Sequence, residues 1–274
     1  MNVDLTINTD LARKILTGFL KSEITRVGFS HAVVGLSGGI DSAVSCVLAA
    51  EALGPDNVLA VRMPYSSSSP DSLEDAEKIA LGLGVRMETF EITPMVDPLI
   101  QREPSMSKLR RGNLMARARM IVLYDRSESF QGLVVGTSNK TEILLGYTTL
   151  WGDMASAVNP LGDLYKTQLR QLACAMDLPK SVIDKPPSAD LWVGQTDEAD
   201  LGFTYEEVDR LLYLLVDQRW DVQDCIEAGI DRDFVENVYK RLRRSQFKRM
   251  MPLIAKLSTR TVGYDFLYLR DWGT

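Results

Sequence analysis

A pair of adjacent glycines between two apolar runs constrains the fold of this chain more than any other feature. Residues 33–42 read VVGLSGGIDS, and residues 43–50 read AVSCVLAA. The apolar residues before the glycines favour a buried β-strand, and those after them favour a helix. We therefore expect a strand, a tight glycine turn and a helix in direct succession.

This turn has the features of a phosphate-binding site. Backbone N–H groups at the start of a helix, together with the positive end of its dipole, attract anions. Gly38 and Gly39 are expected to allow close approach of the backbone and dihedral angles that a Cβ atom would forbid, and Ser37 and Ser42 add hydroxyl donors. Asp41 would repel a bare phosphate, so it implies a metal ion between carboxylate and phosphate oxygens. The sequence predicts a site for magnesium-bound polyphosphate.

Two other phosphate-binding motifs do not fit this spacing. The Walker pattern needs a lysine followed by serine or threonine after its second glycine, and no such pair follows Gly39. The dinucleotide fingerprint needs glycines spaced as G-x-G-x-x-G, and Gly35, Gly38 and Gly39 are spaced otherwise. An ordinary glycine–serine turn is the plain alternative, but the strand–turn–helix context favours a phosphate loop.

The composition is typical of a globular protein. The 274 residues suffice for one large domain, and 45% of them are hydrophobic and 25% charged. No apolar run approaches the about 20 residues of a membrane span, and acidic residues near the N-terminus argue against a signal peptide. The three cysteines are far apart and form no C-x-x-C pair. We expect a reduced, cytoplasmic protein without a zinc site.

Charge and histidine content argue against several function classes. The net charge of −6 gives no overall attraction to nucleic acid, and the basic run at 240–249 is interpreted as a solvated helix face in preference to a binding patch. His31 is the only histidine, which argues against histidine-based triads and general-base schemes. What remains is catalysis that positions phosphates and stabilises charge with metal, lysine and backbone dipoles.

The hydrophobic pattern predicts strands that alternate with helices. Strands are expected at 31–36, 57–63, 86–92 and 132–136, and helices at 9–27, 42–53, 70–82 and 108–127. This order predicts an α/β fold, a doubly wound parallel sheet with helices on both faces. A helical C-terminal part is expected to follow, with helices at 204–218, 222–228 and 232–250. The ends of the first, second and fourth strands would bring the phosphate loop together with residues 63–65 and 137–139.

Four motifs together resemble the NAD synthetase family of N-type ATP pyrophosphatases, which split ATP into AMP and pyrophosphate. The loop LSGGIDS at 36–42 resembles that whole class. Residues 111–120 (RGNLMARARM), 135–142 (VGTSNKTE) and the segment that begins KPPSADL at 185 resemble motifs of the NAD synthetases. The resemblance runs from about residue 10 to residue 252. It implies an adenine nucleotide alpha-hydrolase-like fold and a single synthetase domain over residues 1–274.

The resemblance implies the last step of NAD synthesis. In that reaction the carboxylate of deamido-NAD attacks ATP to give an acyl-adenylate and pyrophosphate, and ammonia then displaces AMP. Asp41 and Glu142 match the family's magnesium ligands, and Asp41 and Lys166 are the expected catalytic residues. The expected ATP-binding residues are Gly35, Leu36, Ser37, Gly38, Gly39, Ile40, Asp41, Ser42, Met63, Thr137, Lys166 and Ser188. The expected substrate-binding residues are Asn113, Arg117, Asp153, Phe247 and Lys248.

Three residues depart from the family pattern on the deamido-NAD side. Leu150 and Ala157 stand where short bacterial enzymes carry Lys and Asp, and Phe247 stands where they carry His. These positions bear on which acid is recognised, whereas the ATP-binding motif is unaffected.

The resemblance also implies the partners of the protein. It implies a homodimer, for which the helix at 108–127 is the candidate interface. No segment resembles a glutaminase domain, so free ammonia, or ammonia from a partner, is the expected nitrogen donor. Two alternatives stay open. One is another ATP pyrophosphatase that adenylates a different carboxylate or carbonyl group. The other is a nucleotide-binding regulator without catalysis, which would tolerate loss of Asp41, Glu142 or Lys166, yet all three are present.

Overall fold

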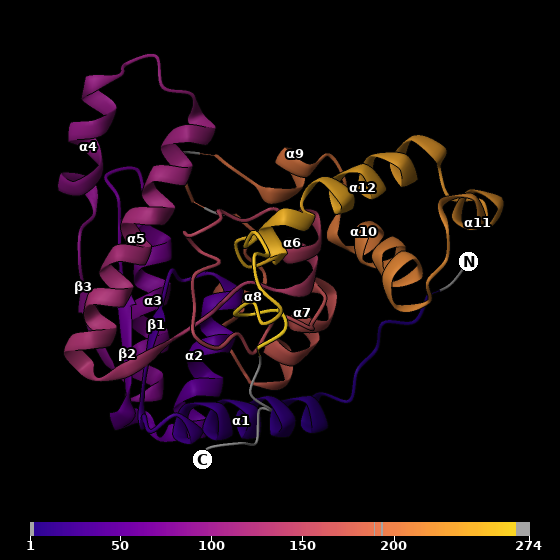
Figure 1. The fold of residues 1–274 in the computed structure, drawn as a ribbon. Coiled ribbons are helices and arrows are strands. Elements are labelled where there is room, and N and C mark those ends of the chain that lie inside the picture. Colours follow the sequence, from indigo (N-terminus) through magenta and orange to yellow (C-terminus); the bar gives the residue numbers. More distant parts are fainter. Residues whose placement is uncertain (1–2, 189, 193, 267–274) are drawn as a thin grey trace.

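The chain forms a four-stranded parallel sheet covered by helices, with a further group of helices beside it (Figure 1). The computed structural model describes residues 3–188, 190–192 and 194–266. The strands are β1 (His31–Gly35), β2 (Val58–Arg62), β3 (Arg86–Thr89) and β4 (Gly132–Val135), in the order β3-β2-β1-β4. The strand order reverses between β1 and β4, and open parallel sheets bind ligands at such a switch point.

Strand β1 is buried on both faces. Val33 pairs in register with Leu59 of β2 and with Val134 of β4. Its neighbours Ala32 and Val34 pack in one apolar cluster, and Val33 itself packs in another on the opposite face. Burial on both faces explains why this strand is a continuous apolar run without polar alternation.

Helices cover both faces of the sheet, which confirms the doubly wound prediction. The Val34 face is covered by α1 (Thr9–Arg26), α2 (Ile40–Leu53), α3 (Pro70–Leu83), α7 (Lys166–Ala175) and α8 (Lys180–Ile183). The Val33 face is covered by α4 (Thr93–Arg102) and α5 (Lys108–Phe130). A short 3₁₀ turn, Pro55–Asn57, leads from α2 into β2.

The predicted helical C-terminal part is also confirmed. Beside the sheet lie α6 (Lys140–Leu145), α9 (Asp197–Leu201), α10 (Tyr205–Leu212), α11 (Val222–Glu227) and α12 (Arg232–Arg244) (Figure 1). A π-helical turn, Tyr213–Asp217, follows α10, and a 3₁₀ turn, Gln246–Arg249, follows α12. These helices share an apolar cluster of their own, separate from the two clusters on the sheet.

The structure corrects one predicted strand and adds helices that the periodicity did not reveal. Strand β3 ends at Thr89, and Ile92, which was expected in the strand, is the N-cap of α4 and is fully buried. Pro94 in the first turn of α4 suits a helix start. Helices α6, α8 and α9 contain 4 to 6 residues, which is too short for a period of about 3.6 to be recognised. Within the described parts of the chain, no helix is long and apolar enough to cross a lipid bilayer.

Candidate active site

A cavity of about 1000 Å³ opens at the carboxyl ends of β1, β2 and β4. This volume is at the upper end of the roughly 300–1,000 Å³ of small-molecule sites. Its wall brings together residues from α5, from the phosphate loop, from the segment around 146–153 and from residues 185–188, 190–192 and 194–197. Of the residues predicted from sequence, it is lined by Gly35, Leu36, Ser37, Gly39, Ile40, Asp41, Ser42, Met63, Asn113, Thr137, Glu142, Asp153, Lys166, Ser188 and Lys248.

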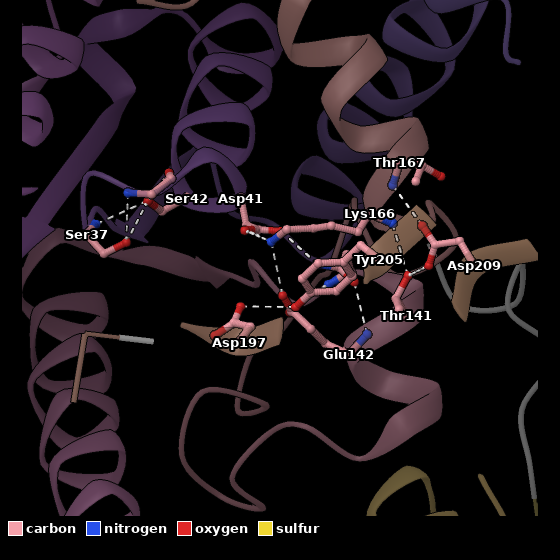
Figure 2. Close-up of polar contacts among 12 residues, drawn as sticks. Ser37, Asp41, Ser42, Thr141, Glu142, Lys166, Thr167, Asp197, Tyr205 and Asp209 are labelled. Carbon is pink, nitrogen blue, oxygen red and sulfur yellow. Dashed lines mark hydrogen bonds and ion pairs between the residues drawn. The ribbon is translucent and has the colours of Figure 1, made fainter. Parts of the chain in front are cut away.

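The phosphate loop closes on itself through two serine hydroxyls (Figure 2). The N–H of Ser37 donates to Oγ of Ser42 at 3.1 Å, and the N–H of Gly39 donates to Oγ of Ser37 at 3.2 Å. The Ser42 hydroxyl donates to the carbonyl oxygen of Gly39 at 2.9 Å. Gly39 is the N-cap of α2 and supplies no capping side chain. The first N–H groups of α2 are therefore free to donate hydrogen bonds to an anion.

The two loop glycines are needed for different reasons. Gly38 has a φ of +82°, and a Cβ atom there would lie 2.1 Å from the carbonyl oxygen of Ser72 in α3. Gly39 has an ordinary φ of −88°, and its Cβ would meet only Oγ of Ser37 at 3.3 Å. The expectation of a dihedral angle closed to other residues is correct for Gly38 and wrong for Gly39.

The ammonium group of Lys166 lies between two carboxylates (Figure 2). Its Nζ is 2.5 Å from Oδ2 of Asp41 and 3.3 Å from Oε1 of Glu142. Lys166 begins α7, Asp41 lies in the first turn of α2, and Glu142 lies in the first turn of α6. Three segments that are distant in sequence thus meet at one ammonium group, whose side chain is only 2% exposed.

Burial and charge together set the protonation states of this cluster. Burial raises the pKa of Glu142 to about 8, with the Lys166 ammonium acting in the opposite direction. Burial by itself would lower the pKa of Lys166, but Asp41 and Glu142 hold the pKa of this ammonium above its ordinary value. Lys166 therefore brings a permanent positive charge to the cavity wall.

Asn139 lies in the motif at 135–142, and it connects the two carboxylate-bearing segments of the site. Its Nδ2 donates to Oδ1 of Asp41 at 2.8 Å, and its Oδ1 accepts from the N–H of Glu142 at 3.0 Å. Asn139 also caps α6 and is fully buried. One amide therefore orients Asp41 and fixes the helix that carries Glu142. The capping pattern Asn-x-x-Glu was the available sequence signal.

The C-terminal helices contribute two further groups that the sequence did not reveal. Nζ of Lys166 lies 5.3 Å from the centre of the Tyr205 ring, within the range of a cation–π contact. The Tyr205 hydroxyl donates to Oδ2 of Asp197 at 3.0 Å, and Asp197 lines the cavity. Burial raises the pKa of Asp197, while Lys166 lowers it. Nothing in the local sequence indicated that α10 would reach Lys166.

A second polar group of the cavity gathers around residues 146–153. The Thr149 hydroxyl donates to Oδ1 of Asn113 at 2.8 Å, and its N–H donates to Oδ1 of Asp153 at 2.7 Å. Nζ of Lys248 donates to the carbonyl oxygens of Gly146 and Thr148 at 2.8 and 2.6 Å. The structure thus brings three predicted substrate residues, Asn113, Asp153 and Lys248, to one segment.

Two arginines of α5 occupy different places. Residues two positions apart point to nearly opposite sides of a helix. Arg119 lines the cavity and donates from Nε to the carbonyl oxygen of Met63 at 3.1 Å, whereas Arg117 is exposed and donates to the carbonyl oxygen of Leu150 at 3.2 Å. Burial lowers the pKa of Arg119. Arg119 had no predicted role, although the motif RGNLMARARM contains it.

Three predicted residues do not line the cavity. Gly38 packs against Ser72, Arg117 is exposed, and Phe247 is 62% exposed. The binding roles of these three residues, like those of the residues that line the cavity, stay predictions.

The fold and the site together define a class of protein. The parallel sheet carries a glycine–serine phosphate loop at its switch point, and a lysine lies between two carboxylates in the same cavity. These features are typical of nucleotide-binding α/β proteins. The chain belongs to the NAD synthase family, whose model matches residues 12–252.

Individual relatives extend this assignment along nearly the whole chain. A protein of Trichlorobacter lovleyi, an NH(3)-dependent NAD(+) synthetase, is 58% identical over 269 residues, which cover 98% of both chains. The structure of NMN synthetase from Francisella tularensis has a TM-score of 0.80 at 30% identity and covers 91% of this chain and 99% of that one. The NH3-dependent NAD synthetase from Campylobacter jejuni has a TM-score of 0.79 at 32% identity, with 91% and 100% covered.

Proposed function

We propose that this protein is an ammonia-dependent NAD synthetase. It activates the nicotinate carboxylate of deamido-NAD on ATP, releases pyrophosphate, and lets ammonia displace AMP from the acyl-adenylate. The observation that carries the proposal is the Lys166 ammonium between Asp41 and Glu142, in the same cavity as the phosphate loop. The ammonia-dependent synthetase of Trichlorobacter lovleyi, matched over 98% of its length, supports the same activity.

The phosphate loop and Lys166 serve the leaving pyrophosphate. Negative charge builds on the β- and γ-phosphates as the bond to the α-phosphorus breaks, and fixed donors lower the barrier where that charge develops. The free N–H groups at the start of α2, the Ser37 hydroxyl and the Lys166 ammonium are such donors, while the Ser42 hydroxyl holds the loop in shape. The loop and the Lys166 side chain are held by hydrogen bonds before substrate arrives, so these donors need little reorganisation during the reaction.

The residues present fit a magnesium ion. Asp41 and Glu142 both line the cavity and supply carboxylate oxygens, the ligands that Mg²⁺ prefers. No set of three or more ligating side chains gathers in the described residues, which agrees with an ion that takes its other ligands from phosphates and water. When bound, Mg²⁺ neutralises charge on the polyphosphate. Asp41 and Glu142 would hold it, and Asn139 orients Asp41 for that purpose.

The acceptor would lie against residues 146–153. Asn113, Asp153 and Lys248 gather there, and Arg119 adds a cavity-lining cation from α5. We also assign Met63, Thr137 and Ser188, which line the cavity, to ATP binding. Arg117 and Phe247 lie outside the cavity, so we assign them to a part of the acceptor that extends beyond it. The mononucleotide form of the acid is the second candidate acceptor, because the Francisella tularensis protein with a TM-score of 0.80 is an NMN synthetase.

We further propose one synthetase unit over residues 1–274 that takes up free ammonia and acts as a cytoplasmic homodimer. The free state of Cys46, Cys174 and Cys225 supports a reducing compartment. Helix α5 is the candidate interface, because it exposes two apolar side chains one turn apart, Ile121 and Tyr124, at 54% and 42%.

Joint product analysis tests the proposed function. The protein is incubated with ATP, Mg²⁺, ammonium and deamido-NAD, and pyrophosphate and NAD are followed together. Equal yields of both are expected, with a higher kcat/KM than for nicotinate mononucleotide. If only nicotinate mononucleotide gave pyrophosphate together with its amide, NMN, the mononucleotide would be the acceptor in place of deamido-NAD. If neither acid gave pyrophosphate, the proposal would be overturned.

A further inference from the structure

Helix α10 packs in the C-terminal apolar cluster, yet two of its residues contact Lys166 directly or through a neighbour. Tyr205 lies near the side-chain ammonium, and Asp209 is linked to the backbone N–H. Val208, Leu211 and Leu212 are fully or almost fully buried in that cluster. Tyr205 places its ring near the Lys166 ammonium, as described above. The other contact runs through Asp209 to the backbone of Lys166 (Figure 2). This second contact has no role in substrate binding, because Asp209 does not line the cavity.

Asp209 joins the two helix starts that carry the cluster. It accepts from the hydroxyl of Thr141 at 2.5 Å and from the N–H of Thr167 at 2.9 Å. The hydroxyl oxygen of Thr141 in turn accepts from the N–H of Lys166 at 3.0 Å. Thr141 precedes Glu142 in the first turn of α6. One carboxylate thus holds α6 and α7 together next to Glu142 and Lys166.

The burial of Asp209 is costly and calls for a reason. The residue is 0% exposed, and no lysine or arginine within the described ranges forms an ion pair with it. A buried carboxylate without a cation costs free energy, even when it accepts hydrogen bonds. The start of α7 offsets part of this cost through its dipole and the Thr167 N–H. Apolar packing of α10 alone would not require a carboxylate at this position.

We propose that Asp209, acting through Thr141, is a positioning residue for the adenylation step. It fixes the first residue of α7, and thereby holds the Lys166 ammonium at its place between Asp41 and Glu142. This inference rests on the proposed function, in which Lys166 contacts the phosphates. Small displacements of such a group are costly, since catalysis depends on its alignment with the reacting atoms. The C-terminal helices therefore help to hold Lys166 in position at the phosphate site.

Three variants of the full chain separate positioning from stability. Thr141→Val removes the relaying hydroxyl without changing the size of the side chain, and Thr141→Ser keeps the hydroxyl. Val208→Ala, beside Asp209 on α10, opens a space in the apolar cluster and leaves the hydrogen bonds of Asp209 in place. For each variant the thermal midpoint, the dissociation constant of ATP with Mg²⁺, and kcat and KM for deamido-NAD are measured.

The expected results differ between the variants. Thr141→Val should weaken ATP binding and lower kcat by about 10–100-fold, the range known for loss of a side chain that orients a metal ligand, with KM for deamido-NAD unchanged. Thr141→Ser should restore both values. Val208→Ala should lower the thermal midpoint but leave ATP affinity and kcat close to those of the wild type.

Two results would overturn the inference. One is wild-type ATP affinity and kcat in Thr141→Val, and the other is an equal loss in Val208→Ala. Failure of the proposed function would look different. The wild type would then make no NAD. The dissociation constants of ATP for Thr141→Val and Val208→Ala would still show whether the Thr141 hydroxyl positions Lys166.

Discussion

Nζ of Lys166 lies 2.5 Å from Oδ2 of Asp41, although the two residues are 125 positions apart in sequence. The contact follows from the pairing of β1 with β4, because the phosphate loop leaves the end of β1 and Asn139 and Glu142 follow the end of β4. Lys166 then enters between them from α7. The chemistry proposed for the cavity depends on this contact.

Replacing Lys166 should abolish most of the activity without unfolding the protein. We expect Lys166→Met to lower kcat by about 10²–10³-fold, as for the loss of one preorganised donor to a developing charge. Steady-state turnover measures the effect, and circular dichroism checks the fold. The control is Lys140→Met, because Lys140 pairs with Asp217 and Asp163 and does not line the cavity. Comparable losses in both variants would contradict the assignment.

The two loop glycines should respond differently to alanine. Gly38→Ala places a Cβ against the Ser72 carbonyl at a positive φ, and we expect it to lower the free energy of unfolding by about 1–3 kcal/mol and to abolish ATP binding. Gly39→Ala meets only one hydroxyl, so its loss should stay below about 1 kcal/mol. Urea denaturation and ATP calorimetry give both quantities. The reverse order would show that the turn is built differently.

The ion pair between buried Asp75 and partly buried Lys185 should make stability depend on pH. Burial acts to raise the pKa of Asp75, but hydrogen bonds from Lys185 and Ser181 prevail and lower this pKa below 3.8. The folded state therefore favours the carboxylate. This stabilisation is present above pH 3.8 and is lost as pH falls through the lowered native pKa.

Asp75→Asn should show this dependence directly. We expect a loss of about 1–3 kcal/mol at pH 7, typical of a hydrogen bond to a charged group, and a smaller difference from wild type at the acid end of a thermal series. Glu74→Gln is the matched control on the same helix, because it removes only an exposed pair with Lys78. A constant difference between Asp75→Asn and wild type from pH 3 to pH 7 would be incompatible with the pair.

A charge on α5 should separate the proposed dimer. Ile121→Glu places a carboxylate on the exposed face of that helix, where Ile121 is 54% exposed. Light scattering is expected to show a monomer for this variant and a dimer for the wild type. Leu81→Glu in α3, at an even more exposed position of 74%, should remain dimeric. A wild-type monomer, or a dimer that survives Ile121→Glu, would exclude α5 as the interface.

The sequence predicted the sheet and the phosphate loop because both are local. Each apolar run, at β1, β2 and β4, and the glycine turn can be recognised from a short local stretch of sequence. The order of strands and helices along the chain then implies the parallel sheet. The short helices around the site were not predicted. Their ends are set by contacts with other segments, such as the Asn139 side chain that caps α6 and contacts Asp41.

The roles of α10 could not be predicted for a related reason. Tyr205 and Asp209 have the appearance of ordinary members of an amphipathic helix, and only the packing of the C-terminal cluster brings them to Lys166. The spacing of Arg117 and Arg119 did contain usable information, because only one of the two can face the cavity. Gly39 shows the opposite case, in which a motif residue does not have the backbone conformation that was expected of it.

Isotope exchange between pyrophosphate and ATP tests the central claim most directly. The protein is supplied with ATP, Mg²⁺, labelled pyrophosphate and deamido-NAD, with ammonia left out. Formation of an acyl-adenylate is reversible, so we predict that label enters ATP only when deamido-NAD is present, and that Lys166→Met stops the exchange. NAD synthesis by the wild type without any exchange, or undiminished exchange in Lys166→Met, would contradict the adenylation chemistry assigned to this cavity.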